Sequence, residues 1–143
     1  MPLHIVKLCV GVETLDDIQF WIDRRSAEQK ALGGEPWHYH VTRMTPRRQE
    51  EVLNGGSLYW VVKGSVQGRQ EITGFEPVTG EDGIARCKIL MKPELVPTEW
   101  QPRRAFQGWR YLKPEDAPRD MDQVSAGALP AHLRAELAEL GLL

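Results

Sequence analysis

The sequence predicts an α+β fold, a small curled mixed β-sheet or pseudo-barrel with two or three flanking helices. Runs of β-branched and aromatic residues recur along the 143 residues, helical spacing of apolar residues is confined to a few segments, and glycines fall inside the longest strand-like runs. This length suits one domain with its own core. We expect that domain at residues 1–118, followed at residues 119–143 by an acidic linker and a short amphipathic helix.

The first part of the chain predicts a strand and then a helix. Residues 4–10 are mostly apolar and β-branched, which favours a largely buried strand. Apolar residues then recur at helical spacing up to Gly33, and Thr14 precedes them as the expected N-cap. Phe20 and Trp21 are expected to anchor the core from this helix.

Residues 37–44 alternate two kinds of side chain, as a strand does. His38 and His40 share one face, and two histidines at this spacing can bind one metal ion. A catalytic zinc site needs a third protein ligand as well. The sequence supplies no third ligand at a regular spacing, so we expect structural histidines and no metal.

The middle of the chain predicts a sheet that bends. A short helix is expected over residues 45–53. Residues 57–78 then predict two strands separated near Gly64 or Gly68. Because glycine tolerates bulges, Gly68 and Gly74 would permit the bends by which a sheet curls.

Two further strands are expected near the C-terminal end of the domain. Residues 84–91 alternate as a strand does, and Cys87 falls on the apolar side, which predicts a buried, inert thiol. Residues 92–107 contain three prolines and predict an irregular surface loop. Residues 109–112 predict the last short strand.

Composition and charge limit the function classes. The net charge is −2, yet residues 36–113 carry 12 Lys and Arg against 8 Asp and Glu, so the central part has a local positive excess that could attract a polyanion. The chain has no paired Cys-x-x-Cys motif and no apolar run of membrane-spanning length. The N-terminal apolar run lacks the marks of a signal peptide. These features predict a cytoplasmic protein that makes no membrane contact.

No nucleotide-loop, hydrolase or metalloprotease motif is present, so no catalytic residue is assigned.

Residues 54–72 and 103–113 interleave aromatic and cationic side chains. Cations neutralise phosphates and aromatic rings offer flat faces to bases, so this composition is typical of surfaces that hold RNA. A half-buried strand has a similar composition, and its alternation would turn about half of these aromatics into the core. The expected stacking residues are Tyr59, Trp60, Phe106, Trp109 and Tyr111. The expected contacts to phosphates or base edges are Arg43, Arg47, Lys63, Arg69, Gln70, Arg103, Arg104, Gln107 and Arg110.

Five motifs together resemble an uncharacterised bacterial family, the domain of unknown function 1489. They lie at residues 3–11, 41–48, 55–64, 69–70 and 104–114. The likeness covers nearly the whole chain through Pro118, and the family name implies no activity.

A more distant likeness is to PUA-like domains, including the ASCH and EVE branches. A predicted helix ends at residues 53–56, a strand follows at once over residues 57–63, and the next strand carries a glycine bend. The resemblance implies a small curled sheet that binds RNA or modified bases. Some ASCH relatives are amidohydrolases acting on acylated cytidine, but here Gly55, Gly56 and Ser57 stand where a Gly-Lys pattern would supply the catalytic lysine.

These observations favour a non-catalytic module that binds RNA or a modified nucleotide on an aromatic and basic concave surface, without a cofactor. Two alternatives stay open. A small amidohydrolase-like enzyme acting on a nucleotide-like substrate would use Lys63 and Glu71 with the hydroxyl of Thr42 or Ser57. A protein-interaction adaptor, or a homodimer, would use the apolar side of the C-terminal helix at residues 130–140.

Overall fold

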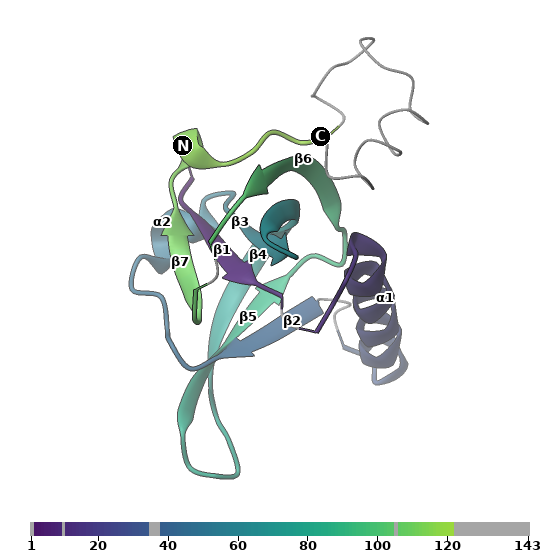
Figure 1. Ribbon diagram of the computed structural model, residues 1–143. Coiled ribbons are helices and arrows are strands. Elements are labelled where there is room, and N and C mark those ends of the chain that lie inside the picture. The colour runs from purple at the N-terminus through teal and green to yellow at the C-terminus, as the bar shows by residue number, and fades with distance from the viewer. Residues whose placement is uncertain (1, 10, 35–37, 105, 122–143) are drawn as a thin grey trace.

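The computed structural model of the chain describes residues 2–9, 11–34, 38–104 and 106–121, and these form two α-helices and seven strands (Figure 1). In chain order the elements are β1 (His4–Leu8), α1 (Leu15–Ala31), β2 (His38–Thr42), α2 (Gln49–Leu53), β3 (Ser57–Val62), β4 (Ser65–Thr79), β5 (Ala85–Met91), β6 (Val96–Pro102), β7 (Trp109–Leu112) and the 3₁₀-helix η1 (Pro114–Asp116). The α+β class is therefore confirmed.

The strands form one mixed sheet in the order β2-β5-β4-β3-β1-β7, and β6 pairs with β4 beside this path. The β1–β3 pair is parallel and the other pairs are antiparallel. Although β2 and β7 stand at opposite ends of the order, the segment after β2 reaches β7: the indole N–H of Trp109 donates to the carbonyl of Met44 at 2.6 Å. The predicted mixed sheet is thus present, and it does not close into a barrel.

The sheet changes direction along β4. The first half of this strand pairs with β3 and β6, and the second half pairs with β5. Its pairing shifts register between Val66 and Gly68 and again between Ile72 and Gly74, at the two predicted glycine bends. A side chain at Gly68 would be crowded, because an ideal Cβ there would lie 2.9 Å from the end of the Leu15 side chain and 3.3 Å from the carbonyl oxygen of Val96.

β3 is covered on both faces, so its alternate residues enter two different core clusters. Leu58 and Trp60 belong to the larger cluster, to which α1 also contributes. Tyr59 and Val61 belong to a second cluster that includes Leu112 of β7. Neighbouring aromatic residues of β3 therefore serve opposite sides of the sheet.

α1 begins at the predicted N-cap. The side chain of Thr14 accepts from the backbone N–H of Asp17, and the carboxylate of Asp17 accepts from the backbone N–H of Thr14. This reciprocal capping box satisfies two N–H groups at the start of the helix. The buried positions of α1 are Ile18, Ile22 and Ser26, which recur at every fourth residue and form one stripe.

The prediction that Phe20 and Trp21 anchor the core is wrong. Their exposed fractions are 64% and 45%. Phe20 follows Ile18 by two residues, so it points about 200° around the helix from the buried stripe. Trp21 lies at the border of that stripe and is only half covered.

Two segments differ from their predicted structure. The loop predicted over residues 92–107 contains β6, which pairs with β4 and otherwise forms, in the described part of the chain, only an isolated bridge between Thr98 and Asp120. Prolines are tolerated in such an edge strand. The helix predicted over residues 45–53 begins only at Gln49. The backbone N–H groups of Arg47 and Arg48 donate instead to the hydroxyl of Tyr111, at 3.0 and 3.1 Å.

The segment after Pro114 lies against the sheet as far as Met121. Asp120 forms an isolated bridge with Thr98 of β6, and the N–H of Met121 donates to the carbonyl of Pro97 at 2.8 Å. The helix predicted over residues 130–140 lies outside the described residues.

Cys87 is 1% exposed, as predicted for a buried thiol, and it is a free cysteine. Among the described residues, no helix is both long and apolar enough to cross a bilayer.

Candidate functional site

A pocket lies between α1 and the sheet, on the side that holds the larger core cluster. Its volume is about 210 Å³, and it is lined by Lys7, Leu8, Cys9, Ile18, Trp21, Arg25, His38, His40 and Trp60. We call it the histidine pocket. Its residues come from β1 and the residue after it, from α1, and from β2 and β3, so long-range packing assembles it.

α1 forms one wall of the histidine pocket. Ile18, Trp21 and Arg25 recur at intervals of three and four residues and therefore share one side of the helix. Arg25 is fixed against β2, because its guanidinium lies 4.2 Å from the centre of the Tyr39 ring and donates to the carbonyl of Tyr39. Trp21 lines the pocket and remains 45% exposed.

The sheet forms the opposite wall. The strand register places Lys7 of β1 beside Trp60 of β3 on one side and Trp109 of β7 on the other. His38 and His40 point to the same side of β2, because side chains two residues apart share a face. The ring of His40 meets that of Trp60 edge to face, with 5.7 Å between centroids.

Burial governs protonation in the histidine pocket. Burial, followed by the charge of Arg25, lowers the pKa of His38 to about 4. Burial, followed by the charges of Lys7 and Arg25, lowers the pKa of His40 to about 4. Both imidazoles are therefore neutral at neutral pH. Burial also raises the pKa of Cys9 to about 11, so this thiol stays protonated and is a poor nucleophile.

The charge of the histidine pocket is unbalanced. Among the described residues that line it, Lys7 and Arg25 are the cations and none is acidic. Within the part of the chain that the structure describes, Lys7 makes no ion pair. The Nδ1 atom of His38, a residue only 5% exposed, has no hydrogen-bond partner there either. A buried polar atom without a partner is uncommon in a native fold and often marks a place for a ligand or water.

Cationic side chains also gather beside β7. The guanidinium of Arg48 lies 5.6 Å from the centre of the Tyr111 ring, and that of Arg110 lies 5.4 Å from the centre of the Phe106 ring. Arg47 is exposed next to Arg48. We call Arg47, Arg48 and Arg110 the basic edge. β7 pairs directly with β1, with Arg110 opposite Val6 and Trp109 opposite Lys7, so Arg110 lies on the strand next to Lys7 but on the other face of the sheet.

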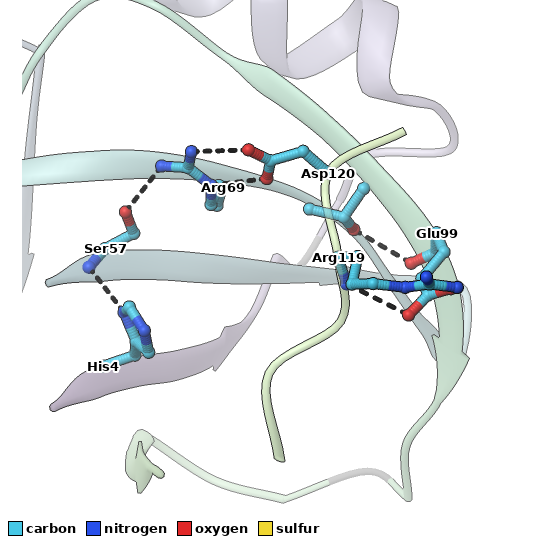
Figure 2. A network of polar contacts seen from close by, with 7 residues as sticks. His4, Ser57, Arg69, Glu99, Arg119 and Asp120 are labelled. Atoms are coloured by element: carbon cyan, nitrogen blue, oxygen red, sulfur yellow. Dashed lines mark hydrogen bonds and ion pairs between the residues drawn. The ribbon is translucent and has the colours of Figure 1, made fainter. Parts of the chain in front are cut away.

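A second, shallower hollow of about 340 Å³ lies over the other side of β3, and it includes Tyr59 and Arg69. Figure 2 shows its polar network: Arg69 donates to both carboxylate oxygens of Asp120, at 2.7 and 2.8 Å, and to the hydroxyl of Ser57 at 3.0 Å. The backbone N–H of Ser57 in turn donates to Nδ1 of His4 at 3.0 Å. The two arginines that line this hollow, Arg69 and Arg119, are thus already paired, with Asp120 and Glu99.

The structure separates the residues predicted to form one binding surface. Of the predicted stacking residues, Trp60 lines the histidine pocket, while Tyr59 belongs to the opposite side of the sheet. Trp60 and Trp109 are only 3% and 4% exposed, so neither offers a free ring face to a base. Tyr111 and Phe106 are half-buried beside the basic edge.

The predicted polar contacts are similarly dispersed. Gln70 is fully buried: its carbonyl accepts from the indole N–H of Trp60 and its amide donates to the carbonyl of Lys92, both at 2.9 Å. It therefore has a structural role in the described fold. Lys63 is exposed and pairs with Glu13 at 3.4 Å. The remaining predicted arginines and Gln107 are exposed or half-exposed on the surface: Arg43, Arg47, Arg103, Arg104 and Arg110.

Sequence reasoning missed Lys7, Trp21 and Arg25 as site residues. Two features of the sequence could have indicated them. Trp21 and Arg25 are four residues apart, so they lie on the same side of the helix that carries the buried stripe. Lys7 interrupts an otherwise apolar strand, and a lone cation in such a strand suggests a polar cavity.

The groups required by the enzymatic alternative do not meet. Ser57 and Glu71 line the shallow hollow, but Lys63 does not, and Glu71 forms an ion pair with Lys92. Thr42 is buried on β2. Among the described residues, no group of three His, Cys, Asp or Glu side chains is arranged to hold a metal ion.

The fold and the histidine pocket define an α+β protein with an open, curled mixed sheet and a small cationic cavity. The chain belongs to the family described as "Protein of unknown function (DUF1489)", whose model matches residues 5–143. No curated protein and no solved structure matches the chain.

Proposed function

We propose that this protein is a non-catalytic module that binds RNA or a modified nucleotide, with one base in the histidine pocket and the adjoining phosphates on the basic edge. The observation that carries this proposal is that a half-exposed Trp21 and two cations, Lys7 and Arg25, line one partly open cavity. Aromatic stacking and cationic neutralisation are the two interactions on which single-stranded nucleic acid binding depends.

The dimensions of the histidine pocket support a ligand of one ring. Its volume of about 210 Å³ lies below the roughly 300–1,000 Å³ of pockets that take drug-sized ligands. A flipped base enters such a pocket singly, while the chain on either side stays on the surface.

The neutral imidazoles support recognition of a base edge. A neutral imidazole has one N–H donor and one acceptor nitrogen, so His38 and His40 can pair with the mixed donors and acceptors of a base. The buried Nδ1 of His38 has no hydrogen-bond partner within the described chain. A ligand group could therefore form a hydrogen bond with this atom without breaking one that the protein already makes.

The fold supports an extension of the proposal to the PUA-like class. α2 ends at Leu53, Gly55 and Gly56 follow, and β3 starts at Ser57, in the order that suggests this class. Gly56 is required there, because an ideal Cβ would lie 2.2 Å from the carbonyl oxygen of Leu3. The two free cysteines suit a reducing compartment, which supports a cytoplasmic location.

The test compares two neighbouring aromatic residues of α1. Labelled single-stranded RNA is titrated at two salt concentrations while tryptophan fluorescence is followed. Because stacking of one base contributes about 1–3 kcal/mol, Trp21→Ala should weaken binding roughly 5- to 150-fold. Phe20→Ala is the matched control, since Phe20 is 64% exposed and does not line the pocket, and it should bind as the wild type does.

Two outcomes would contradict the proposal. In the first, no RNA or single-stranded DNA binds even at low salt, which would favour a protein partner instead. In the second, RNA binds but Trp21→Ala and Phe20→Ala have equal affinities, which would place the nucleic acid away from the histidine pocket.

A further inference from the structure

We propose that the histidine pocket selects a ring that carries an anionic oxygen group, with the ring against Trp21 and the anion between Lys7 and Arg25. This inference deepens the proposed function, on which it rests, by naming the chemistry of the group that enters the cavity. The anionic group is a carboxylate on the ring or a phosphate attached close to it.

The cations of the histidine pocket face no acidic side chain among its described lining residues. Buried or half-buried ammonium groups are normally paired, because removing a charge from water is costly. Lys7 is half-buried on β1 and has no ion pair within the described chain. Burial lowers the pKa of Lys7, and the neighbouring Cys9 opposes this effect only in part. An anionic ligand would supply that charge.

Arg25 is held in place beside the pocket by its contacts with Tyr39. Its guanidinium is held over Tyr39 and donates to the Tyr39 carbonyl, and Lys88 lies on the same ring with 4.2 Å between its ammonium nitrogen and the ring centroid. These contacts involve a carbonyl and a π-system but no carboxylate. The positive charge beside the pocket is therefore positioned before any ligand arrives, which reduces the ordering cost of binding an anion.

The two histidines of the pocket are suited to an anionic oxygen as well. After burial, the charges of Lys7 and Arg25 contribute to the low pKa of His40, so both cations act on this imidazole of the pocket wall. His38 and His40 are neutral and can donate one N–H each to an anionic oxygen without adding charge of their own. Enclosure strengthens these interactions, because Coulomb energies rise as the surroundings become less polar.

The experiment uses two pairs of ligands that differ only in the anion. Orotate and uracil share a pyrimidine ring, with and without a carboxylate, and uridine 5′-monophosphate and uridine differ by a phosphate. Each is titrated into the full chain by calorimetry. A charge-assisted hydrogen bond contributes about 1.5–3 kcal/mol, so we expect the anionic member of at least one pair to bind at least about tenfold more tightly.

Two variants assign the preference to the pocket. Lys7→Met removes the charge while keeping an unbranched side chain, and it should abolish most of the preference for the anion. Lys30→Met, at an exposed position in the last turn of α1, is the matched control and should retain the full preference. Unfolding of both variants is measured first. As a readout that does not depend on a variant, the imidazole signals of His38 and His40 should shift in NMR spectra on adding the anionic ligand, while that of His4 should not.

Each outcome is decisive. A Lys7-dependent preference for orotate identifies a carboxylate as the anion, and a Lys7-dependent preference for the monophosphate identifies a phosphate. Equal binding within both pairs, a preference that Lys7→Met leaves intact, or no binding of any anionic ring overturns the inference. If RNA still binds through Trp21 while both pairs are equal, the proposed function stands and only this inference fails.

Discussion

Acid should destabilise this protein through its two pocket histidines. In the unfolded chain an imidazole takes up a proton near pH 6.5, whereas in the folded chain His38 and His40 do so only near pH 4. Between these values the unfolded state binds more protons, so the free energy of unfolding falls as the pH falls from about 6.5 to about 4. Above this range both states are neutral at these positions and the effect vanishes.

The expected size follows from the two pKa values. For one imidazole whose pKa changes from 6.5 to about 4, linkage predicts a loss of about 2 kcal/mol at pH 5 and about 3 kcal/mol below pH 4. Two such groups would remove about 4 kcal/mol at pH 5. That is a large share of the roughly 5–15 kcal/mol by which domains are usually stable.

Urea unfolding at about pH 7.5 and pH 5, followed by circular dichroism, measures this loss. His38→Gln should reduce the difference between the two pH values by about 2 kcal/mol, because one titrating group is gone. The measurement at the higher pH is the internal control for any other effect of the substitution. If His38→Gln and His40→Gln both leave the pH dependence of the wild type unchanged, the account of two buried neutral imidazoles is refuted.

Two further predictions concern the hydrogen bonds that support the sheet. Gln70→Leu should lower the free energy of unfolding by about 2–4 kcal/mol, because it leaves the indole N–H of Trp60 and a backbone carbonyl buried without partners. The control, Gln107→Leu, changes an exposed amide and should alter the free energy of unfolding by less than about 0.5 kcal/mol. Equal effects of the two substitutions in urea unfolding would contradict the structural role of Gln70. The side chains of Arg69 and Asp120, which form an ion pair, are 25% and 16% exposed. A double-mutant cycle with Arg69→Met and Asp120→Asn should give a coupling free energy of about 1 kcal/mol in the free energy of unfolding. A coupling of zero would mean that this pair does not hold the segment after η1 against the sheet.

Local signals in the sequence predicted much of the fold. Thr14 was recognisable as an N-cap because its chemistry acts within one turn of the helix. The separation of β3 from β4 at Gly64 was recognisable for a similar reason: Lys63 and Gly64 have φ values of 48° and 83°, and glycine adopts such angles readily. Gly68 and Gly74 likewise marked the bends of β4.

The direction in which each aromatic points could not be predicted locally. β3 is buried on both faces, so the alternation of Tyr59 and Trp60 separates two sides without identifying either as solvent. β6 was missed because its pairing with β4 is a long-range contact, and its prolines argue against a strand unless it is known to lie at an edge.

The candidate site was missed for the same physical reason. Lys7, Trp21 and His38 come from three segments that only the packed sheet and helix bring together. Their spacing in the sequence therefore carries no motif. The interleaved aromatic and cationic residues, by contrast, belong mainly to a strand with two buried faces and to the exposed basic edge.

The most direct test of the central claim is to map RNA binding on the isotopically labelled protein by NMR. A short single-stranded RNA is titrated at low salt while backbone amide, indole and imidazole signals are followed. The account predicts the largest shifts at Lys7, Trp21, His38 and His40, with smaller shifts along the basic edge. Shifts confined to the basic edge or to the hollow around Arg69, with the histidine pocket unchanged, would contradict it.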